Sequence, residues 1–323
     1  MACKTFSLDI PWGGRYMAEL SCCKKRGHKR CVLGIWVEYS SIIGRMTTTR
    51  RFPTHIALPQ DHGSWVFLFS PLVIGLVAGQ AWNADTLALV VAALAAFLIR
   101  QPLTIAVKVY SKRRHRRDLP PARLWSAIYA LIGSASLAWL CSRGHKYLLY
   151  LALPAIPVFA WHLYLVSKRA ERRQAGVEIL ATGVLALAAP AAYWVGRGAL
   201  LPAGWVLWLL VWLQSAASIV YAYLRLEQRR WKEIPPAPQR WLAGRRALAY
   251  ASFNVAATGL LALAGYLPAG IALPYAVQLI ETLWGITHPA VQARPTAIGM
   301  RQLAVSTLYT LLFAWGWFAF APF

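Results

Sequence analysis

Apolar residues form nine long runs between positions 65 and 320, and short polar gaps separate them. Most runs are close to the roughly 20 residues that an α-helix needs to cross the hydrocarbon core of a bilayer. The pattern therefore predicts an all-α protein, a polytopic transmembrane helical bundle of about nine spans. The predicted spans are Trp65–Trp82, Leu87–Val107, Leu124–Cys141, Tyr147–Val166, Val177–Val195, Leu201–Leu224, Ala247–Leu267, Ile271–Ile286 and Leu303–Phe320.

Basic residues fall almost entirely in every second gap between these runs. The gaps after the second, fourth, sixth and eighth runs hold 20 Lys and Arg residues, whereas the other gaps hold 3. Cytoplasmic loops of membrane proteins carry an excess of Lys and Arg. We therefore expect a multi-pass membrane protein with a cytoplasmic amino terminus and with Ala321–Phe323 outside.

The composition agrees with this placement. The chain is 58% hydrophobic and has a formal net charge of +23, which is unlike both a soluble enzyme and a disordered basic tail. Cationic loops beside an anionic leaflet gain roughly 1 kcal/mol per residue. Membrane lipids therefore account for the charge, and we expect no nucleic-acid partner.

The amino-terminal residues 1–54 differ from the rest of the chain. They are polar, basic and cysteine-containing, without sustained helical or strand periodicity. We expect this segment to be disordered, or residues 1–45 not to be made if translation begins at Met46. Residues 55–323 then form one transmembrane helical domain, because the connections between spans are too short to fold alone.

The amino-terminal segment also holds side chains of the types that bind zinc, namely Cys22, Cys23, His28 and Cys31. Adjacent cysteines strain a tetrahedral site, and the spacing fits the paired-cysteine patterns poorly. We therefore predict no metal site and no cofactor.

Ionisable residues inside spans indicate candidate functional positions, because each costs several kcal/mol unless it is paired or hydrated. The candidates are Arg100, His162, Glu178 and Glu281. Glu281 is the most informative, since it lies mid-span with Gln278 one turn before it. A partner such as Arg100 would offset its burial, and both a structural ion pair and a site residue remain open for Glu281.

Helical spacing places further polar residues on two stripes that descend toward the predicted cytoplasmic face. The stripes are Arg100, Thr104 and Lys108 in the second span, and Tyr221, Arg225 and Arg229 at the end of the sixth. Pro102 lacks a backbone N–H and is expected to kink the second span. Two cationic stripes could meet over an anionic head group, because the planar guanidinium binds phosphate or carboxylate through two parallel hydrogen bonds.

A motif at the entrance to the first span resembles the YwiC-like family of bacterial membrane proteins. This is Pro59-Gln60-Asp61-His62-Gly63-Ser64-Trp65, and the stretch Arg294-Pro295-Thr296-Ala297-Ile298-Gly299-Met300-Arg301-Gln302 before the last span is similar to a second family segment. The family has no established activity, so the resemblance implies placement rather than function. Within these motifs, His62 could bind an anion when charged, and Arg294 is a further candidate.

Nine spans with the amino terminus inside also resemble the UbiA superfamily of intramembrane prenyltransferases. Those enzymes carry Asp-rich motifs on their second and sixth helices, which hold magnesium and a diphosphate. Here Arg100 to Lys108 and Tyr221 to Arg229 occupy the comparable stretches, and basic residues stand where carboxylates are required. A shared fold would therefore imply that Arg and Lys alone hold any diphosphate.

Our leading interpretation is a multi-pass protein of the bacterial inner membrane that resembles the YwiC-like family. We expect it to bind an anionic lipid-like or isoprenoid-like molecule at the cytoplasmic ends of the first, second and sixth spans. Whether it is catalytic stays open. The candidate ligand-binding residues are His62, Arg100, Thr104, Lys108, Tyr221, Arg225, Glu281 and Arg294. The alternatives are a small-solute transporter using Glu281, Gln278 and Pro274, and a non-catalytic assembly partner.

Overall fold

The computed structural model describes residues 5–9, 15–25, 28–37, 54–59, 62–170 and 174–319. Two compact units divide the chain, Met1–Arg51 and Phe52–Phe323. The side chains of Cys22, Cys23, His28 and Cys31 lie outside the described residues, as does that of His62. The location predicted for Ala321–Phe323 likewise stays a prediction.

The first unit contains three strands, β1 (Thr5–Asp9), β2 (Arg15–Lys25) and β3 (His28–Val37). They form an antiparallel sheet in the order β1-β2-β3. We expected no regular structure in this segment. Whether residues 1–45 are translated stays a prediction.

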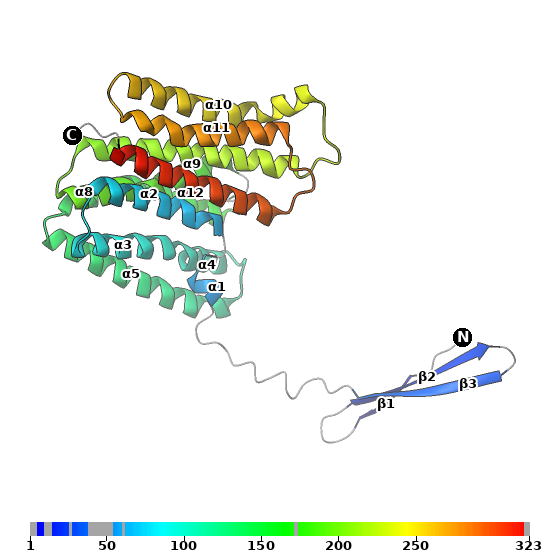
Figure 1. Cartoon of the computed structure of the whole chain (residues 1–323). Helices are drawn as coiled ribbons and strands as arrows, with labels where there is room; N and C mark the ends of the chain where they lie inside the picture. The colour runs from blue at the N-terminus through cyan, green and yellow to red at the C-terminus, as the bar shows by residue number, and fades with distance from the viewer. Residues whose placement is uncertain are drawn as a thin grey trace. The chain divides into compact units, whose positions relative to one another are not determined.

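The second unit is all-helical (Figure 1). Its first half contains α1 (Thr54–Ala57), α2 (His62–Gly79), α3 (Ala84–Leu98), α4 (Arg100–Tyr110), α5 (Leu119–Ser142), α6 (Ala152–Ser167), α7 (Ala175–Ala186) and α8 (Ala188–Arg197). Its second half contains α9 (Pro202–Gln228), α10 (Ala237–Leu263), α11 (Ala272–Thr287) and α12 (Pro295–Ala319). Three 3₁₀ turns precede α5, α6 and α11, namely η2 (Arg116–Asp118), η3 (Lys146–Leu151) and η4 (Ala269–Ile271).

The predicted spans are confirmed by these helices. Within the described residues, eight helical segments are long and apolar enough to cross a membrane, and Gly63–Gly79 is a shorter apolar helix at the place of the first span. The second unit is therefore all-α, and the protein is a multi-pass membrane protein. The large apolar side chains that it exposes suit a lipid environment, among them Leu263 at 88% exposure.

Proline explains two interruptions within spans. The expected kink at Pro102 is confirmed, because the second span divides into α3 and α4 three residues earlier. An interruption that we did not foresee separates α7 from α8 at Leu187, three residues before Pro190. In both places the proline ring removes a backbone donor and crowds the preceding turn.

The connection between α9 and α10 is shorter than the sequence indicates. Helix α10 begins at Ala237 rather than at Ala247, directly after Pro236 as its N-cap residue. Proline is favoured at a helix start, and the Arg, Leu and Ala residues that follow it have high helix propensity. Polar helical turns therefore extend α10 beyond its apolar run.

Helix α8 lies at the centre of the first half and packs against α2, α3, α7 and α9. Every residue from Ala188 to Val195 is buried. Glycines let α2 approach it closely: a Cβ on Gly75 would lie 2.3 Å from the carbonyl oxygen of Ala189, and Gly196 meets Gly79. Small residues at such seams allow backbones to pack tightly in membranes.

Helix α9 forms the core of the second half and packs against α7, α8, α10, α11 and α12. Large side chains fill this core, including Leu207, Tyr275, Tyr309 and Phe313. The connections from α9 to α10 and from α11 to α12 lie at the same end of the bundle (Figure 1). Both connections carry basic residues, so this is the predicted cytoplasmic end.

Candidate functional site

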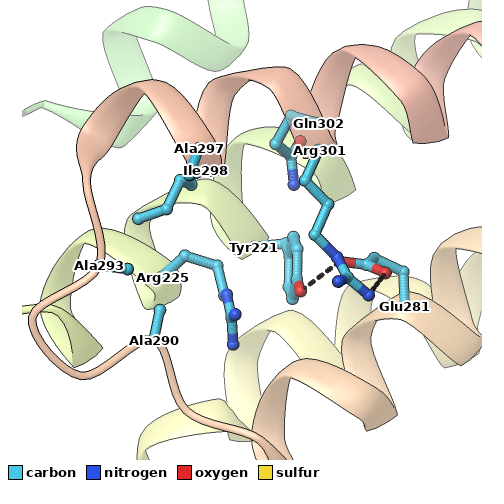
Figure 2. A pocket seen from close by; sticks show the side chains of 9 residues that line it. All are labelled: Tyr221, Arg225, Glu281, Ala290, Ala293, Ala297, Ile298, Arg301 and Gln302. Carbon is cyan, nitrogen blue, oxygen red and sulfur yellow. Dashed lines mark hydrogen bonds and ion pairs between the residues drawn. The ribbon is translucent and has the colours of Figure 1, made fainter.

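A cavity of about 360 Å³ opens between α9, α11 and α12 near the predicted cytoplasmic end of the bundle (Figure 2). Five of the lining residues are polar and come from all three helices, and the remaining four are small or apolar. The lining residues are Tyr221, Arg225, Glu281, Ala290, Ala293, Ala297, Ile298, Arg301 and Gln302.

The cavity lies slightly below the helix ends. Glu281 comes six residues before the last residue of α11, and Arg301 comes six residues after the first residue of α12. At 1.5 Å per residue, both side chains start about 9 Å from those helix ends. We therefore expect the cavity to lie near the boundary between lipid head groups and acyl chains if these helix ends lie at the membrane surface.

Glu281 is held by two partners on neighbouring helices. The Tyr221 hydroxyl donates to its Oε1 at 2.7 Å, and Arg301 donates from Nε to Oε1 at 2.6 Å and from Nη2 to Oε2 at 2.8 Å. The guanidinium of Arg301 also lies 3.4 Å above the ring centroid of Trp284. The partner that we suggested, Arg100, is therefore wrong: Arg301 on α12 offsets the burial of Glu281.

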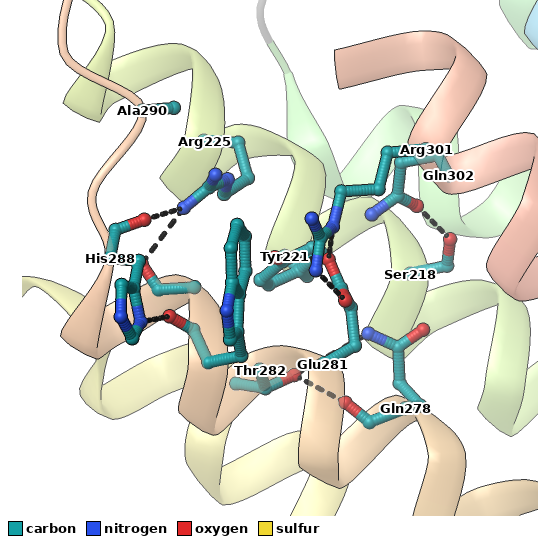
Figure 3. Close-up of polar contacts among 12 residues, drawn as sticks. Ser218, Tyr221, Arg225, Gln278, Glu281, Thr282, His288, Ala290, Arg301 and Gln302 are labelled. Atoms are coloured by element: carbon teal, nitrogen blue, oxygen red, sulfur yellow. Dashed lines mark hydrogen bonds and ion pairs between the residues drawn. The ribbon is translucent and has the colours of Figure 1, made fainter. Parts of the chain in front are cut away.

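Arg225 is the most informative group in the cavity, because its side chain is only 6% exposed. Its Nη1 donates to the Gln228 side chain at 2.9 Å and to the Gly285 carbonyl at 2.9 Å. It also donates to the His288 carbonyl at 2.8 Å (Figure 3). Among the described residues, no carboxylate lies within ion-pair distance of Arg225. Its three hydrogen bonds all leave from one nitrogen, so the Nε–Nη2 edge of the guanidinium is left without a partner in the described part of the chain.

The last turn of α11 and the loop after it fix the position of Arg225. The fully buried Gln228 donates to the Gly285 carbonyl at 2.9 Å and accepts from the Ala290 N–H at 3.2 Å. A Cβ at Gly285 would lie 2.4 Å from the Tyr221 hydroxyl oxygen. Glycine is therefore required at this crossing of α9 and α11.

Polar side chains continue from the cavity into the bundle. Ser218 donates to Gln302 at 2.7 Å, as Figure 3 shows, and Gln214 donates to Gln278 at 3.1 Å. Gln278 also contacts Thr282 at 3.4 Å. The Oε1 atom of Gln214 is buried without a hydrogen-bond partner. The interface of α9, α11 and α12 is therefore polar over several turns.

Comparison with known proteins finds a similarity in the first half of the helical unit. A family model described as "YwiC-like protein" matches residues 58–193. We call these residues the YwiC-like region because of this similarity. The uncharacterized protein YwiC of Bacillus subtilis (strain 168) is 28% identical over 170 residues, which cover 50% of this chain and 62% of that relative. The resemblance found in the first-span motif is therefore confirmed.

One solved structure has a similar course of the chain. It is described as "Structural and mechanistic insights into the biosynthesis of Digeranylgeranylglyceryl phosphate synthase in membranes". The match has 12% identity and a TM-score of 0.46, and it covers 79% of this chain and 92% of that one. This TM-score is too low to assign a shared fold, so the description of the second unit as all-helical depends on its own helices.

The YwiC-like region ends before the cavity begins. Its last matched residue is 193, whereas every residue that lines the cavity belongs to α9, α11, α12 or the loop between the last two. The motif from Arg294 to Gln302 also lies beyond the matched region. The family match therefore places the first half of the bundle, and the cavity is a property of the second half.

The structure gathers three of the predicted site residues at the cavity, namely Tyr221, Arg225 and Glu281. Arg100, Thr104 and Lys108 lie on α4 in the YwiC-like region, which packs against α1, α3, α5 and α6. The guanidinium of Arg100 lies 5.5 Å from the ring centroid of Phe97. The two cationic stripes therefore do not share the cavity. Arg294 is exposed and directly precedes α12, and His62 lies outside the residues whose side chains are described.

Sequence reasoning missed four residues that shape the cavity: Gln228, Trp284, Arg301 and Gln302. Gln228 follows Tyr221 by seven residues, and this helical spacing could have identified it. Arg301 and Gln302 end the second family-like motif, where we selected Arg294 instead. Trp284 gave no signal distinct from an interfacial anchor.

Among the described residues, no three His, Cys, Asp or Glu side chains group as metal ligands would. The cavity instead offers guanidinium, amide and hydroxyl groups above an apolar wall. Such groups can bind an anion and hold it in one orientation.

Proposed function

We propose that this protein binds an anionic lipid-like or isoprenoid-like molecule, whose head group occupies the cavity against Arg225. The observation that carries the proposal is the buried guanidinium with an open two-donor edge. A buried charge without an opposite charge is costly. An anion on that edge would offset the cost and complete the hydrogen bonds of Arg225.

The apolar part of the cavity wall supports an amphiphilic ligand rather than a free inorganic ion. Ala293, Ala297 and Ile298 line it with methyl groups, and they offer no donor to an anion. The cavity lies at the boundary of the head-group region, so a head group held there can leave its hydrocarbon chain among the helices or in the bilayer.

Lipid retention during purification tests this proposal. Lipids that co-purify with the wild type in mild detergent would be extracted and quantified by mass spectrometry, beside the variants Arg225→Gln and Arg225→Lys. Charge-assisted hydrogen bonds contribute about 1.5–3 kcal/mol, so Arg225→Gln is expected to lower retention of the bound anionic lipid at least about tenfold. Arg225→Lys keeps the charge but lacks the planar guanidinium edge. Its lipid retention is expected to lie between that of the wild type and that of Arg225→Gln.

Arg230→Gln is the matched control, because Arg230 is an exposed cation just beyond the end of α9 and does not line the cavity. It removes the same charge from the same basic face. Equal lipid retention in the wild type and Arg225→Gln, or an equal loss in both glutamine variants, would end the proposal.

Transport of a small solute is the second candidate. The observation in its favour is the buried polar interface below the cavity, where Gln214 and Gln278 lie close to Glu281. The same purified proteins in liposomes separate the two candidates. Solute uptake that Glu281→Gln abolishes would favour transport, whereas lipid retention without uptake across a broad solute panel would favour the binding function.

A further inference from the structure

We infer that the head group bound in the cavity carries a single negative charge shared by two equivalent oxygens, as in a phosphodiester or a carboxylate. This inference rests on the proposed function and names the class of its ligand. It separates singly charged head groups from phosphomonoesters and diphosphates, which carry more charge.

The charge of the cavity is the first reason. Three of its nine lining residues carry a formal charge, namely Arg225, Arg301 and Glu281. Two cations and one anion give a net charge of +1. A singly charged head group neutralises this lining, whereas each additional negative charge would remain uncompensated at a partly buried position.

The second reason is the number of free donor edges. Arg301 already uses Nε and Nη2 on the two oxygens of Glu281. Arg225 uses only Nη1, so one edge with two parallel donors remains for a ligand. Two parallel donors match two oxygens of one phosphate or carboxylate group, and a second phosphate would find no comparable edge among the residues that line the cavity.

Gln302 supplies a further donor at the cavity wall. Its Oε1 accepts the hydrogen bond from Ser218 at 2.7 Å, so its orientation leaves the amide NH₂ group on the other side. Among the described residues this NH₂ group has no hydrogen-bond partner. It could donate to an ester oxygen of a phosphodiester, which a carboxylate lacks.

The same chemistry could come from two sources, a membrane phospholipid or a free fatty acid, and a competition experiment distinguishes them. The full chain in detergent, stripped of lipid, would be mixed at pH 8 with equal amounts of phosphatidylglycerol, oleate, phosphatidic acid and geranylgeranyl diphosphate. Native mass spectrometry then measures the fraction of each in the complex. Phosphatidylcholine serves as the zwitterionic reference.

The wild type is expected to hold phosphatidylglycerol or oleate about tenfold better than phosphatidic acid or the diphosphate, equivalent to about 1.4 kcal/mol. Preference for phosphatidylglycerol would identify a phospholipid as the source, and preference for oleate a fatty acid. A wild type that prefers phosphatidic acid or the diphosphate overturns the inference.

Variants of the ion pair test whether charge sets this preference. Glu281→Gln raises the net charge of the lining to +2 and is expected to shift binding toward phosphatidic acid. The double variant Glu281→Gln/Arg301→Gln returns the charge to +1 and should restore the wild-type order. If the single variant does not fold, the wild-type ranking and the double variant still decide, since the double variant leaves neither Arg301 nor Glu281 charged without the other.

The failure of this inference differs from the failure of the proposed function. Lipid binding that depends on Arg225 but follows the opposite order of charge refutes only the inference. If Arg225→Gln binds each of the five lipids as well as the wild type does, the proposed function is refuted too. Arg230→Gln should keep the wild-type order, because its charge lies outside the cavity.

Discussion

The YwiC-like region and the four helices after it pack in opposite ways. At the end of the first region, α2 and α8 meet through Gly75, Gly79 and Gly196, the last of which lies just beyond residue 193. In the second region, α9, α11 and α12 leave a cavity among them, and long polar side chains line it. The first half is a close-packed scaffold, and the second half provides the space and the charges that a ligand needs.

The family model and the cavity cover different parts of the chain. The matched residues 58–193 include Gly75 and Gly79 of this seam, and Gly196 follows them. The ion pair of Glu281 and Arg301 and the open edge of Arg225 lie beyond them. Substitutions at the glycine seam and at the ion pair therefore test this difference in packing most directly.

Gly75→Ala is expected to have the largest effect on stability. Its Cβ would lie 2.3 Å from the carbonyl oxygen and 2.9 Å from the Cα of Ala189, so α2 and α8 must separate. Overpacking of this kind costs about 3 kcal/mol. Unfolding by heat or by SDS titration of the detergent-solubilised protein should reveal the loss.

Gly259→Ala on α10 is the matched control, because a Cβ at Gly259 meets nothing within 4 Å. Alanine is the better helix former, so this variant should gain up to about 1 kcal/mol. The two identical substitutions thus have opposite expected signs. Equal effects in both would show that the seam between α2 and α8 is not close-packed.

Arg301→Gln should have the next largest effect, this time in the second half. It leaves the carboxylate of Glu281, whose side chain is 8% exposed, without its cation. The Arg301 side chain is 42% exposed, so solvent already weakens the pair, and we expect a loss of about 2 kcal/mol rather than the full value for a buried pair.

Adding Glu281→Gln to Arg301→Gln should recover most of this stability, because neither residue is then charged. The same unfolding measurement on the wild type, both single variants and the double variant gives the coupling energy directly. A coupling energy near zero would show that the contact does not stabilise the bundle.

Much of the fold was predictable because length and hydropathy determine membrane spans. The nine apolar runs correspond to the helices, and Pro102 marks the division between α3 and α4. Polar helical turns were not predictable in this way, since hydropathy ends where the bilayer ends. The start of α10 at Ala237 and the strands β1 to β3 were missed for that reason.

The candidate site was predictable only along single helices. Spacing by four residues placed Tyr221 and Arg225 on one face of α9, and the structure brings both to the cavity. Helical spacing could not select the partner of Glu281, because Arg100 and Arg301 are both basic residues near the predicted cytoplasmic face. Packing of α11 against α12 rather than α4 decides for Arg301.

Lys108→Gln sharpens the comparison with the smallest expected effect. Lys108 belongs to the cationic stripe on α4 that the sequence placed at the head group, and no residue of α4 lines the cavity. Its charge then acts on the ligand only as one of 20 cations on the same predicted face, most of them screened by salt. Lipid retention should therefore stay within about twofold of the wild type, against the at least about tenfold loss expected for Arg225→Gln. A tenfold loss in Lys108→Gln would mean that the YwiC-like region contributes directly to the head-group site and that the two halves do not divide scaffold from binding.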